Sequence, residues 1–198
     1  MAIKSSTISP SQFAFAEARR AELDDPDLRA RLRYEEVDYR RHRPGESALY
    51  DRIVSVGMFE HVGRWHYPVY FRTIRRLLKP DGRALVHSIV APGSGPTAEW
   101  VAKEVFPGGY IPAEGQVLAS LDGTGLVVEA VHRQPGWHYR RTLECWDERF
   151  ADAWRTRMAA SPEGRRVFRQ WRMYFAGCQN AFESQVGMYV AQFVLRPA

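Results

Sequence analysis

The sequence predicts an α/β fold built on a mostly parallel sheet. Residues 53–56 form a short apolar run typical of a buried strand over 52–56, residues 67–78 repeat apolar side chains at helical spacing, and residues 83–90 are again nearly all apolar. A strand, a helix and a strand in this order form a βαβ unit, whose two strands are parallel. We expect the late apolar runs 125–131 and 188–195 to be strands that pair antiparallel.

The N-terminal elements follow from capping and turn residues. Ser9 and Pro10 suit the N-cap and first position of a helix over 12–23, because a serine hydroxyl can accept an orphan amide hydrogen bond and proline needs none. The cluster at 24–27, rich in aspartate and broken by proline, ends that helix. The next expected elements are a strand at 33–39 and a polar loop at 40–47.

The middle and end of the chain alternate turns with long helices. Lys-Pro-Asp-Gly at 79–82 predicts a turn that stops the helix over 67–78, and the Gly/Pro-rich stretch 91–96 predicts a loop. Residues 142–160 and 163–182 are too long and aromatic to be simple crossovers. We therefore predict a helical insertion over 138–183 that forms a lid over a binding pocket.

Composition indicates one domain, residues 1–198, in the cytoplasm. The chain is 45% hydrophobic, has no apolar run of membrane-spanning length, and shows no signal peptide at its start. Its two cysteines are too few for a disulfide framework or a zinc site, so we expect buried free thiols and no metal. The net charge of +5 favours acidic partners, but no nucleic-acid-binding motif occurs, so we expect no nucleic acid.

An adjacent acid and base follow the strand at 52–56. After Gly57 come an apolar pair and then Glu60 and His61. Ligands of open α/β sheets bind beyond the carboxyl ends of the strands, so this pair is a candidate site. The alternative is a structural pair at a strand end.

Several phrases in order closely resemble one family, the cyclopropane-fatty-acid synthases with their mycolic-acid relatives. The likeness runs from residue 7 to the C-terminal part of the chain, and the order and spacing of the phrases make it specific. The phrases are Thr-Ile-Ser-Pro-Ser-Gln at 7–12, Asp-Tyr-Arg at 38–40, Phe-Glu-His-Val-Gly at 59–63, Leu-Leu-Lys-Pro-Asp-Gly at 77–82, His-Ser-Ile at 87–89, Phe-Pro-Gly-Gly-Tyr-Ile-Pro at 106–112, His-Tyr at 138–139 and Gln-Phe-Val at 192–194.

This resemblance implies a class I, Rossmann-like methyltransferase fold that uses S-adenosylmethionine. The implied reaction transfers a methyl group to the cis double bond of an unsaturated phospholipid acyl chain, and the resulting carbocation loses a proton as a cyclopropane ring closes. A methyl branch is a related product. An alkene is a poor nucleophile, so the site must hold it dry and aligned, and aromatic faces stabilise a nearby cation.

The resemblance also implies roles for individual residues. A bicarbonate that accepts the proton would be held by Glu60, the His87 side chain, the Ile89 backbone and Tyr139. By default His87 would instead be a core histidine, and Tyr139 has the aromatic neighbours Trp137 and His138. The residues implied for S-adenosylmethionine are Thr7 and Gln12 at the ribose, Asp38 and Tyr39 at the adenine, and His61 at the methionine part.

The family's glycine-rich loop, of the form Gly-Cys-Gly-Trp-Gly, has no counterpart in this sequence. We therefore expect a truncated methyltransferase domain that lacks the first strand and this loop, and whose strand at 52–56 has an unpaired side that invites association. Three readings follow: a truncated synthase, a chain completed by another polypeptide or by self-association, and a non-catalytic lipid-binding or interaction module. A related small-molecule N-methyltransferase is the alternative enzyme.

Arginines gather on one face of the last predicted helix. Residues 165–172 contain four arginines, while apolar side chains follow at i, i+3 and i+4 spacing on the other face. The plain interpretation is a solvated surface. The functional interpretation is peripheral contact with anionic lipid at the inner membrane face, because basic residues near such a surface each add about 1 kcal/mol.

Overall fold

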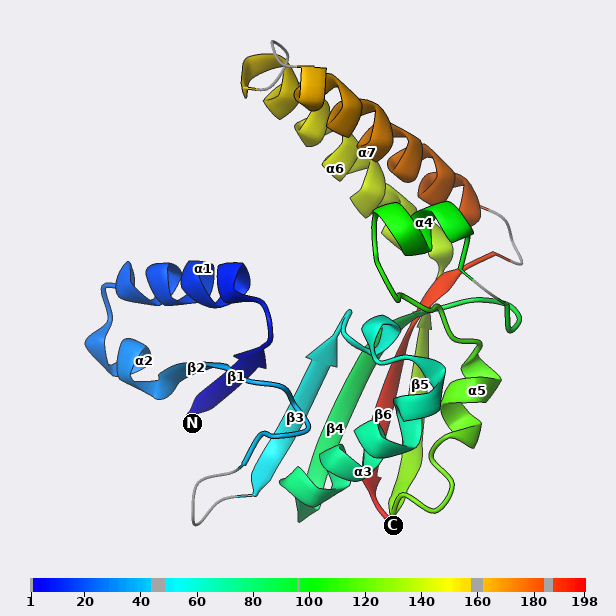
Figure 1. Cartoon of the computed structure of the whole chain (residues 1–198). Helices are drawn as coiled ribbons and strands as arrows, with labels where there is room; N and C mark the ends of the chain where they lie inside the picture. The colour runs from blue at the N-terminus through cyan, green and yellow to red at the C-terminus, as the bar shows by residue number, and fades with distance from the viewer. Residues whose placement is uncertain (1, 44–48, 96, 158–161, 184–186) are drawn as a thin grey trace. The chain divides into compact units, whose positions relative to one another are not determined.

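Two separate sheets organise the computed structural model, which describes residues 2–43, 49–95, 97–157, 162–183 and 187–198. The chain divides into two units, Met1–Leu49 and Tyr50–Ala198, each with its own sheet. Figure 1 shows both units and the helices and strands named below. The single domain over 1–198 stays a prediction.

The first unit contains two paired parallel strands, and two helices connect them in the sequence. β1 (Ile3–Thr7) pairs with β2 (Leu32–Glu36), so that Thr7 faces Glu36. α1 (Pro10–Ala21) begins as predicted, since the Ser9 side chain caps it by accepting from the amide of Gln12. The predicted strand at 33–39 is shorter and ends at Glu36.

A second helix, α2 (Pro26–Arg31), was not predicted. The Asp25 side chain accepts hydrogen bonds from the amides of Asp27 and Leu28, which caps the helix. The acidic cluster therefore ends α1 and also starts α2. Residues 44–47 of the predicted loop lie outside the described part of the chain.

The second unit contains a mixed four-stranded sheet in the order β3-β4-β6-β5. β3 (Tyr50–Val56) and β4 (Leu78–Val90) are parallel and are joined by α3 (Tyr67–Leu77), which confirms the βαβ unit. β6 (Tyr189–Pro197) runs antiparallel to both β4 and β5 (Leu126–Gln134), as predicted for the late strands.

The Lys-Pro-Asp-Gly segment lies within β4 instead of forming a separate turn. Tyr50 pairs with Leu78 and Arg52 pairs with Arg83, so residues 79–82 bulge out of the ladder between these pairs. Proline has no amide to donate to a ladder, and a bulge tolerates it.

Two long helices form a hairpin that projects from the end of the sheet at which β3, β4 and β5 finish (Figure 1). They are α6 (Gly136–Arg157) and α7 (Pro162–Ala181), and residues 158–160 of the predicted helix lie outside the described residues. The hairpin occupies the segment 138–183, whose function as a lid stays a prediction. The short helices α4 (Glu99–Glu104) and α5 (Glu114–Ala119) were not predicted.

Aromatic side chains anchor the turn after β3 beneath α3. Phe59 is fully buried, and its ring lies 4.2 Å from that of Tyr67, 5.1 Å from that of Tyr70 and 5.5 Å from that of Phe71. Replacing one such buried phenylalanine by alanine costs on the order of 3–5 kcal/mol, so the buried rings stabilise the fold. The turn that follows β3 is therefore held rigidly.

β3 is not the buried strand that its apolar run predicts. Val54 is 67% exposed and Val56 is 62% exposed. Within the described residues β3 pairs on one side only, with β4, so its other edge is open. The expectation of an unpaired strand is therefore confirmed for this part of the chain. Among the same residues, no helix combines the length and apolarity needed to cross a bilayer.

Candidate active site

Glu60 lies on a short 3-10 turn, η1 (Phe59–His61), directly after β3. Gly57 has a φ of +60°, a conformation in which glycine has no steric penalty, and this lets the chain turn sharply as the strand ends. The buried ring of Phe59 then fixes the turn, and Glu60 is itself only 7% exposed. Strand end, glycine and anchored ring together place the carboxylate at the carboxyl edge of the sheet.

Two hydrogen bonds hold Glu60 between neighbouring segments. The amide of Ile89, near the end of β4, donates to Oε1 of Glu60 at 2.7 Å. The amide of Tyr110 donates to the Glu60 carbonyl at 2.8 Å. Glu60 therefore joins the ends of β3 and β4 to the loop that precedes α5.

Three polar side-chain atoms in this part of the second unit are buried without a hydrogen-bond partner among the described residues. They are Oε2 of Glu60, Nδ1 of His87 and the hydroxyl of Tyr67. His87 and Ile89 are two residues apart on β4, so their side chains share one face of the sheet. Tyr67 lies close enough for the charge of Glu60 to contribute to raising the pKa of its hydroxyl, although burial is the main cause. Buried polar atoms left this way favour a polar ligand among them.

Tyr139 enters from α6 and approaches the same carboxylate. Burial raises the pKa of its hydroxyl, and electrostatic interactions with Glu60 and with the Cys178 thiol raise it further. The Tyr139 ring lies 4.8 Å from that of Phe182 and packs with Ile89 against the hydrophobic cluster at the base of the hairpin. The hydroxyl thus remains a neutral hydrogen-bond donor beside a carboxylate.

Aromatic side chains form a wall beside these polar groups. Tyr174 of α7 lies 5.6 Å, ring to ring, from Phe106, which in turn lies 5.7 Å from the ring of His61. The Tyr174 hydroxyl hydrogen-bonds with the thiol of Cys178, and burial raises the pKa of both groups. A wall of this kind suits an apolar ligand and a developing positive charge.

Both cysteines are free, but they are half-buried and not fully buried as expected. In the described part of the chain, no group of three or more histidine, cysteine, aspartate or glutamate side chains is placed to hold a metal ion.

The first unit gathers its predicted residues at the ends of β1 and β2. Thr7 donates from Oγ1 to Oε1 of Gln12 at 2.7 Å, and the amide of Val37 donates to the Thr7 carbonyl at 2.9 Å. Asp38 follows β2 and accepts two or more hydrogen bonds from Arg40, whose guanidinium holds the pKa of that carboxyl below its usual range. Tyr39 is half-buried, and burial raises the pKa of its hydroxyl.

The structure therefore brings the predicted residues together in two sets. Glu60, Ile89 and Tyr139 converge in the second unit, His87 lies two residues before Ile89 on β4, and the exposed His61 contacts the ring of Phe106. Thr7, Gln12, Asp38 and Tyr39 converge in the first. The roles of these residues stay predictions.

Sequence reasoning assigned no role to four residues that the structure places at the site. Phe106 and Tyr110 belong to a phrase shared with the family, which is a signal that could have drawn attention to them. Tyr67 and Tyr174 carry no such signal, since each reads as an ordinary apolar position of an amphipathic helix.

A family model matches the same residues. The model of mycolic acid cyclopropane synthetase matches residues 1–193. Among curated relatives, the chain is 38% identical over 137 residues to a cyclopropane-fatty-acyl-phospholipid synthase of Escherichia coli, covering 69% of this chain and 35% of that protein. It is 32% identical over 190 residues to the tuberculostearic acid methyltransferase UfaA1 of Mycobacterium tuberculosis, covering 92% of this chain and 42% of that protein.

Solved structures agree with the fold. The chain resembles the cyclopropane synthase MmaA2 from Mycobacterium tuberculosis with a TM-score of 0.82 and 28% identity, over 98% of this chain and 69% of that one. It resembles the mycolic acid cyclopropane synthase CmaA1, crystallised with SAH and CTAB, with a TM-score of 0.81, 25% identity and the same coverage. The fold is thus that of the class I methyltransferases. This chain spans about a third to two fifths of the length of the two curated relatives above.

Proposed function

The chain belongs to the family of mycolic acid cyclopropane synthetases, and on that premise we propose that it transfers a methyl group from S-adenosylmethionine to the cis double bond of an unsaturated phospholipid acyl chain. The product is a cyclopropane or a methyl-branched chain. The observation that carries this proposal is the Ile89–Glu60 hydrogen bond at the edge of the sheet, together with the buried atoms Oε2 of Glu60 and Nδ1 of His87, which have no hydrogen-bond partner among the described residues.

The reaction needs a proton acceptor beside an apolar wall. Methylation of an alkene places positive charge on the acyl chain, and a proton must leave a carbon that no water approaches. A carboxylate that stays in place beside the chain stabilises that charge and directs the proton. Glu60 meets this need because its backbone and side chain are both fixed by amide hydrogen bonds.

Bicarbonate fits as the immediate acceptor. Tyr139, kept neutral by burial, can donate to such an anion, and an imidazole N–H of His87 can do the same. Glu60 would then share a proton with the anion, since two bare anions in contact repel. The amide of Ile89, which the family resemblance assigns to bicarbonate, donates to Glu60 in this structure.

Individual residues implied for S-adenosylmethionine carry suitable groups. When bound, this cofactor supplies an electrophilic methyl group. Asp38 offers a carboxylate that can accept from ribose hydroxyls, and the half-buried Tyr39 offers an aromatic face. Thr7 and Gln12 offer polar groups on a rigid helix start, and His61 lies at the edge of the other set.

We further propose contact with an anionic membrane at its inner, cytoplasmic face. The substrate is lodged in a bilayer, and α7 carries four arginines against a single carboxylate. Attraction to anionic lipid would bring the hairpin to its substrate.

We propose that the open edge of β3 receives a further strand, from a second copy or from another polypeptide. Val54 and Val56 expose apolar surface along that edge, and unpaired strand edges with exposed valines favour pairing. Such a partner would complete the sheet beside Glu60.

Calorimetric titration of S-adenosylhomocysteine into the purified chain tests the proposal. Saturable binding supports it, whereas no binding by a folded chain would contradict methyl transfer by this polypeptide alone.

A comparison of substrates separates the two enzyme readings. With unsaturated phospholipid as acceptor, Glu60→Gln should abolish methyl transfer, while Glu148→Gln, at an exposed glutamate of α6, should not. If amines are methylated in place of lipid and Glu60→Gln has no effect, the chain is a small-molecule N-methyltransferase.

A further inference from the structure

A groove between α4 and α7 lies outside the site described above. Its volume is about 270 Å³. It combines cationic, polar and apolar side chains, and the lining residues are Trp100, Glu104, Arg166, Arg169, Gln170 and Met173. Gln170 braces it by donating from Nε2 to the Glu104 carbonyl at 3.3 Å.

We propose that this groove binds the phosphodiester of a glycerophospholipid and so holds the headgroup of the lipid substrate. This inference rests on the proposed function, because it assigns a second contact to the same substrate. The roles proposed for the described residues of the Glu60 site concern the acyl chain and the proton, so a separate headgroup contact would fix how far the acyl chain enters.

The charges of the groove favour a phosphate with a single negative charge. Arg166 pairs with Glu163 at 2.8 Å, whereas within the described residues no carboxylate pairs with Arg169. Arginine presents a planar fork of donors that matches phosphate oxygens. The exposed carboxylate of Glu104 partly offsets the positive charge of the groove and repels a bound anion. This repulsion is stronger for free phosphate, with its charge of about −1.5 to −2, than for the single charge of a phosphodiester.

The apolar part of the groove suits the glycerol and the start of an acyl chain. Met173 is 55% exposed and lies one helical turn from Arg169, and Trp100 faces the groove from α4. Tryptophan and arginine are the side chains that favour the boundary between headgroups and hydrocarbon. The groove therefore changes from cationic to apolar along α7.

The distance along α7 matches the depth of an acyl chain. Gln170 of the groove and Cys178 are eight positions apart, about 12 Å along the helix axis, and with Tyr174 between them they lie on one stripe of α7. Cys178 contributes to raising the pKa of Tyr139, which places it near the proposed proton acceptor. The middle of an acyl chain lies roughly 14 Å from its headgroup phosphate, given the thicknesses of the hydrocarbon and headgroup layers. A lipid held in the groove would thus extend along this stripe and present its mid-chain carbons toward Cys178.

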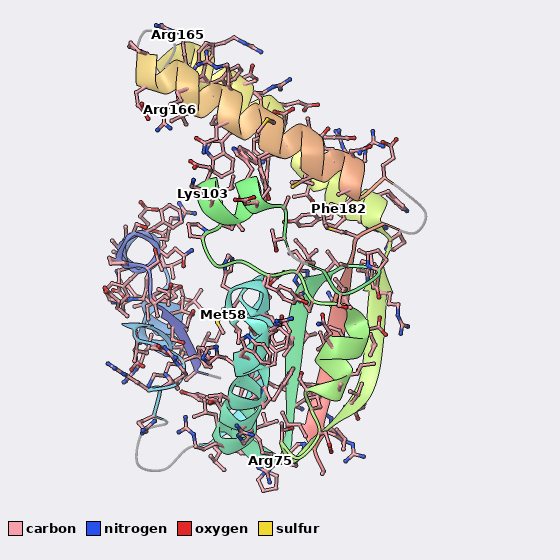
Figure 2. All side chains as sticks on the ribbon, turned by 45° about the vertical axis from the view of Figure 1, so that its right-hand side comes forward. Met58, Arg75, Lys103, Arg165, Arg166 and Phe182 are labelled. Carbon is pink, nitrogen blue, oxygen red and sulfur yellow. The ribbon has the colours of Figure 1, made fainter. Side chains whose placement is uncertain are left out.

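Further cations surround the groove. Figure 2 labels Lys103 on α4 and Arg165 and Arg166 at the outer end of α7, with Phe182 at the opposite, inner end of the hairpin. Lys103 and Arg165 are exposed. They add general attraction to an anionic membrane, whereas Arg169 supplies the specific contact.

The test is calorimetric titration of the full chain with a short-chain phosphatidylglycerol below its micelle concentration. We expect saturable binding that Arg169→Gln weakens about tenfold or more, as for the loss of a charge-assisted hydrogen bond. Arg169→Lys keeps the charge but not the fork, and should also weaken binding. Arg149→Gln removes an exposed arginine of α6 outside the groove and should leave binding unchanged.

Two outcomes would overturn the inference. Equal weakening by Arg169→Gln and Arg149→Gln would mean that only general charge matters, and unchanged binding by Arg169→Gln would mean that the groove is not the site. A parallel titration with inorganic phosphate separates the sources, since binding as tight as that of the lipid would identify a site for free phosphate instead.

The same samples are titrated with S-adenosylhomocysteine. If the unmodified chain binds the lipid but not S-adenosylhomocysteine, the proposed function is contradicted and the lipid groove stands. If it binds S-adenosylhomocysteine but not the lipid, the groove is contradicted and the proposed function stands.

Discussion

The amide of Ile89 donates a 2.7 Å hydrogen bond to Oε1 of Glu60, and this contact joins the end of β4 to the turn after β3. The donor comes from the backbone, so substitution of Ile89 does not remove it. Substitution of Glu60 acts on the acceptor, and the choice of side chain separates two roles of that residue.

Glu60→Gln keeps an acceptor oxygen for the Ile89 amide but removes the negative charge. We expect methyl transfer to fall about a hundredfold or more, in the range usual for loss of a positioned base, with little change in the urea midpoint. Glu60→Ala also leaves a buried amide without a partner and should cost about 1–3 kcal/mol of stability. Equal activity of Glu60→Gln and the unmodified chain would refute a role for the charge.

Tyr139→Phe removes only the hydroxyl. The ring packs against Phe182, so the free energy of unfolding should change little, while methyl transfer should fall because one donor to the bicarbonate is lost. Added bicarbonate should restore part of the rate if the variant binds the anion more weakly. A variant that responds to bicarbonate as the unmodified chain does would show that Tyr139 only packs.

Stability should fall at alkaline pH. Burial raises the pKa of Cys178, Tyr139 and Tyr174, so the folded state favours their neutral forms. The unfolded chain ionises first, so this stability is complete below the ordinary thiol pKa of about 8.5 and is lost as the pH rises through the folded values. Urea midpoints measured between neutral pH and pH about 10.5 should decline, and less steeply in Tyr139→Phe. A flat profile would contradict the burial of these groups.

Gly136 marks a close backbone approach at the start of α6. A Cβ there would lie 2.5 Å from the carbonyl oxygen of Met188 and 2.6 Å from that of Phe182. Gly136→Ala should therefore destabilise the protein by about 1–3 kcal/mol.

Gly177→Ala is the matched control, because a Cβ at that position of α7 meets nothing within 4 Å. In a helix interior this change should stabilise by roughly 0.5–1 kcal/mol. Thermal unfolding of both variants checks the pair, and similar shifts in the two would contradict the close approach.

Val54→Lys tests whether the open edge of β3 associates. A charge on an exposed edge strand opposes pairing with a further strand. We expect sedimentation of the unmodified chain to reveal association that this substitution reduces. Phe15→Lys removes another strongly exposed apolar side chain, in the first unit, and should leave that association unchanged. A chain that remains monomeric at every concentration would exclude self-association and leave a different polypeptide as the partner.

Local signals predicted most of the secondary structure. The Ser9–Pro10 start of α1 and the strand–helix–strand order of β3, α3 and β4 follow from capping and periodicity, which act over a few residues. The same capping signal occurs at Asp25–Pro26 and was read only as a helix end. The exposure of β3 could not be inferred from its apolar run, because exposure depends on which strands lie beside it.

The residues of the candidate site also fall into those that the sequence could predict and those that only the folded structure brings into place. The family phrases led to Glu60, Ile89 and Tyr139, which the structure brings together, and to His87, which lies on the same strand as Ile89. Tyr67 approaches them because Phe59 fixes η1 beneath α3, and that packing is a tertiary relationship that no local pattern contains.

Mass spectrometry of phospholipid acyl chains tests the central claim most directly. The chain is incubated with S-adenosylmethionine and vesicles of a monounsaturated phospholipid, and the acyl chains are examined for the gain of one CH₂. We predict that gain with the unmodified chain and with Glu148→Gln, and its loss with Glu60→Gln. No gain with a folded chain that binds S-adenosylhomocysteine, or an equal gain with Glu60→Gln, would contradict the account.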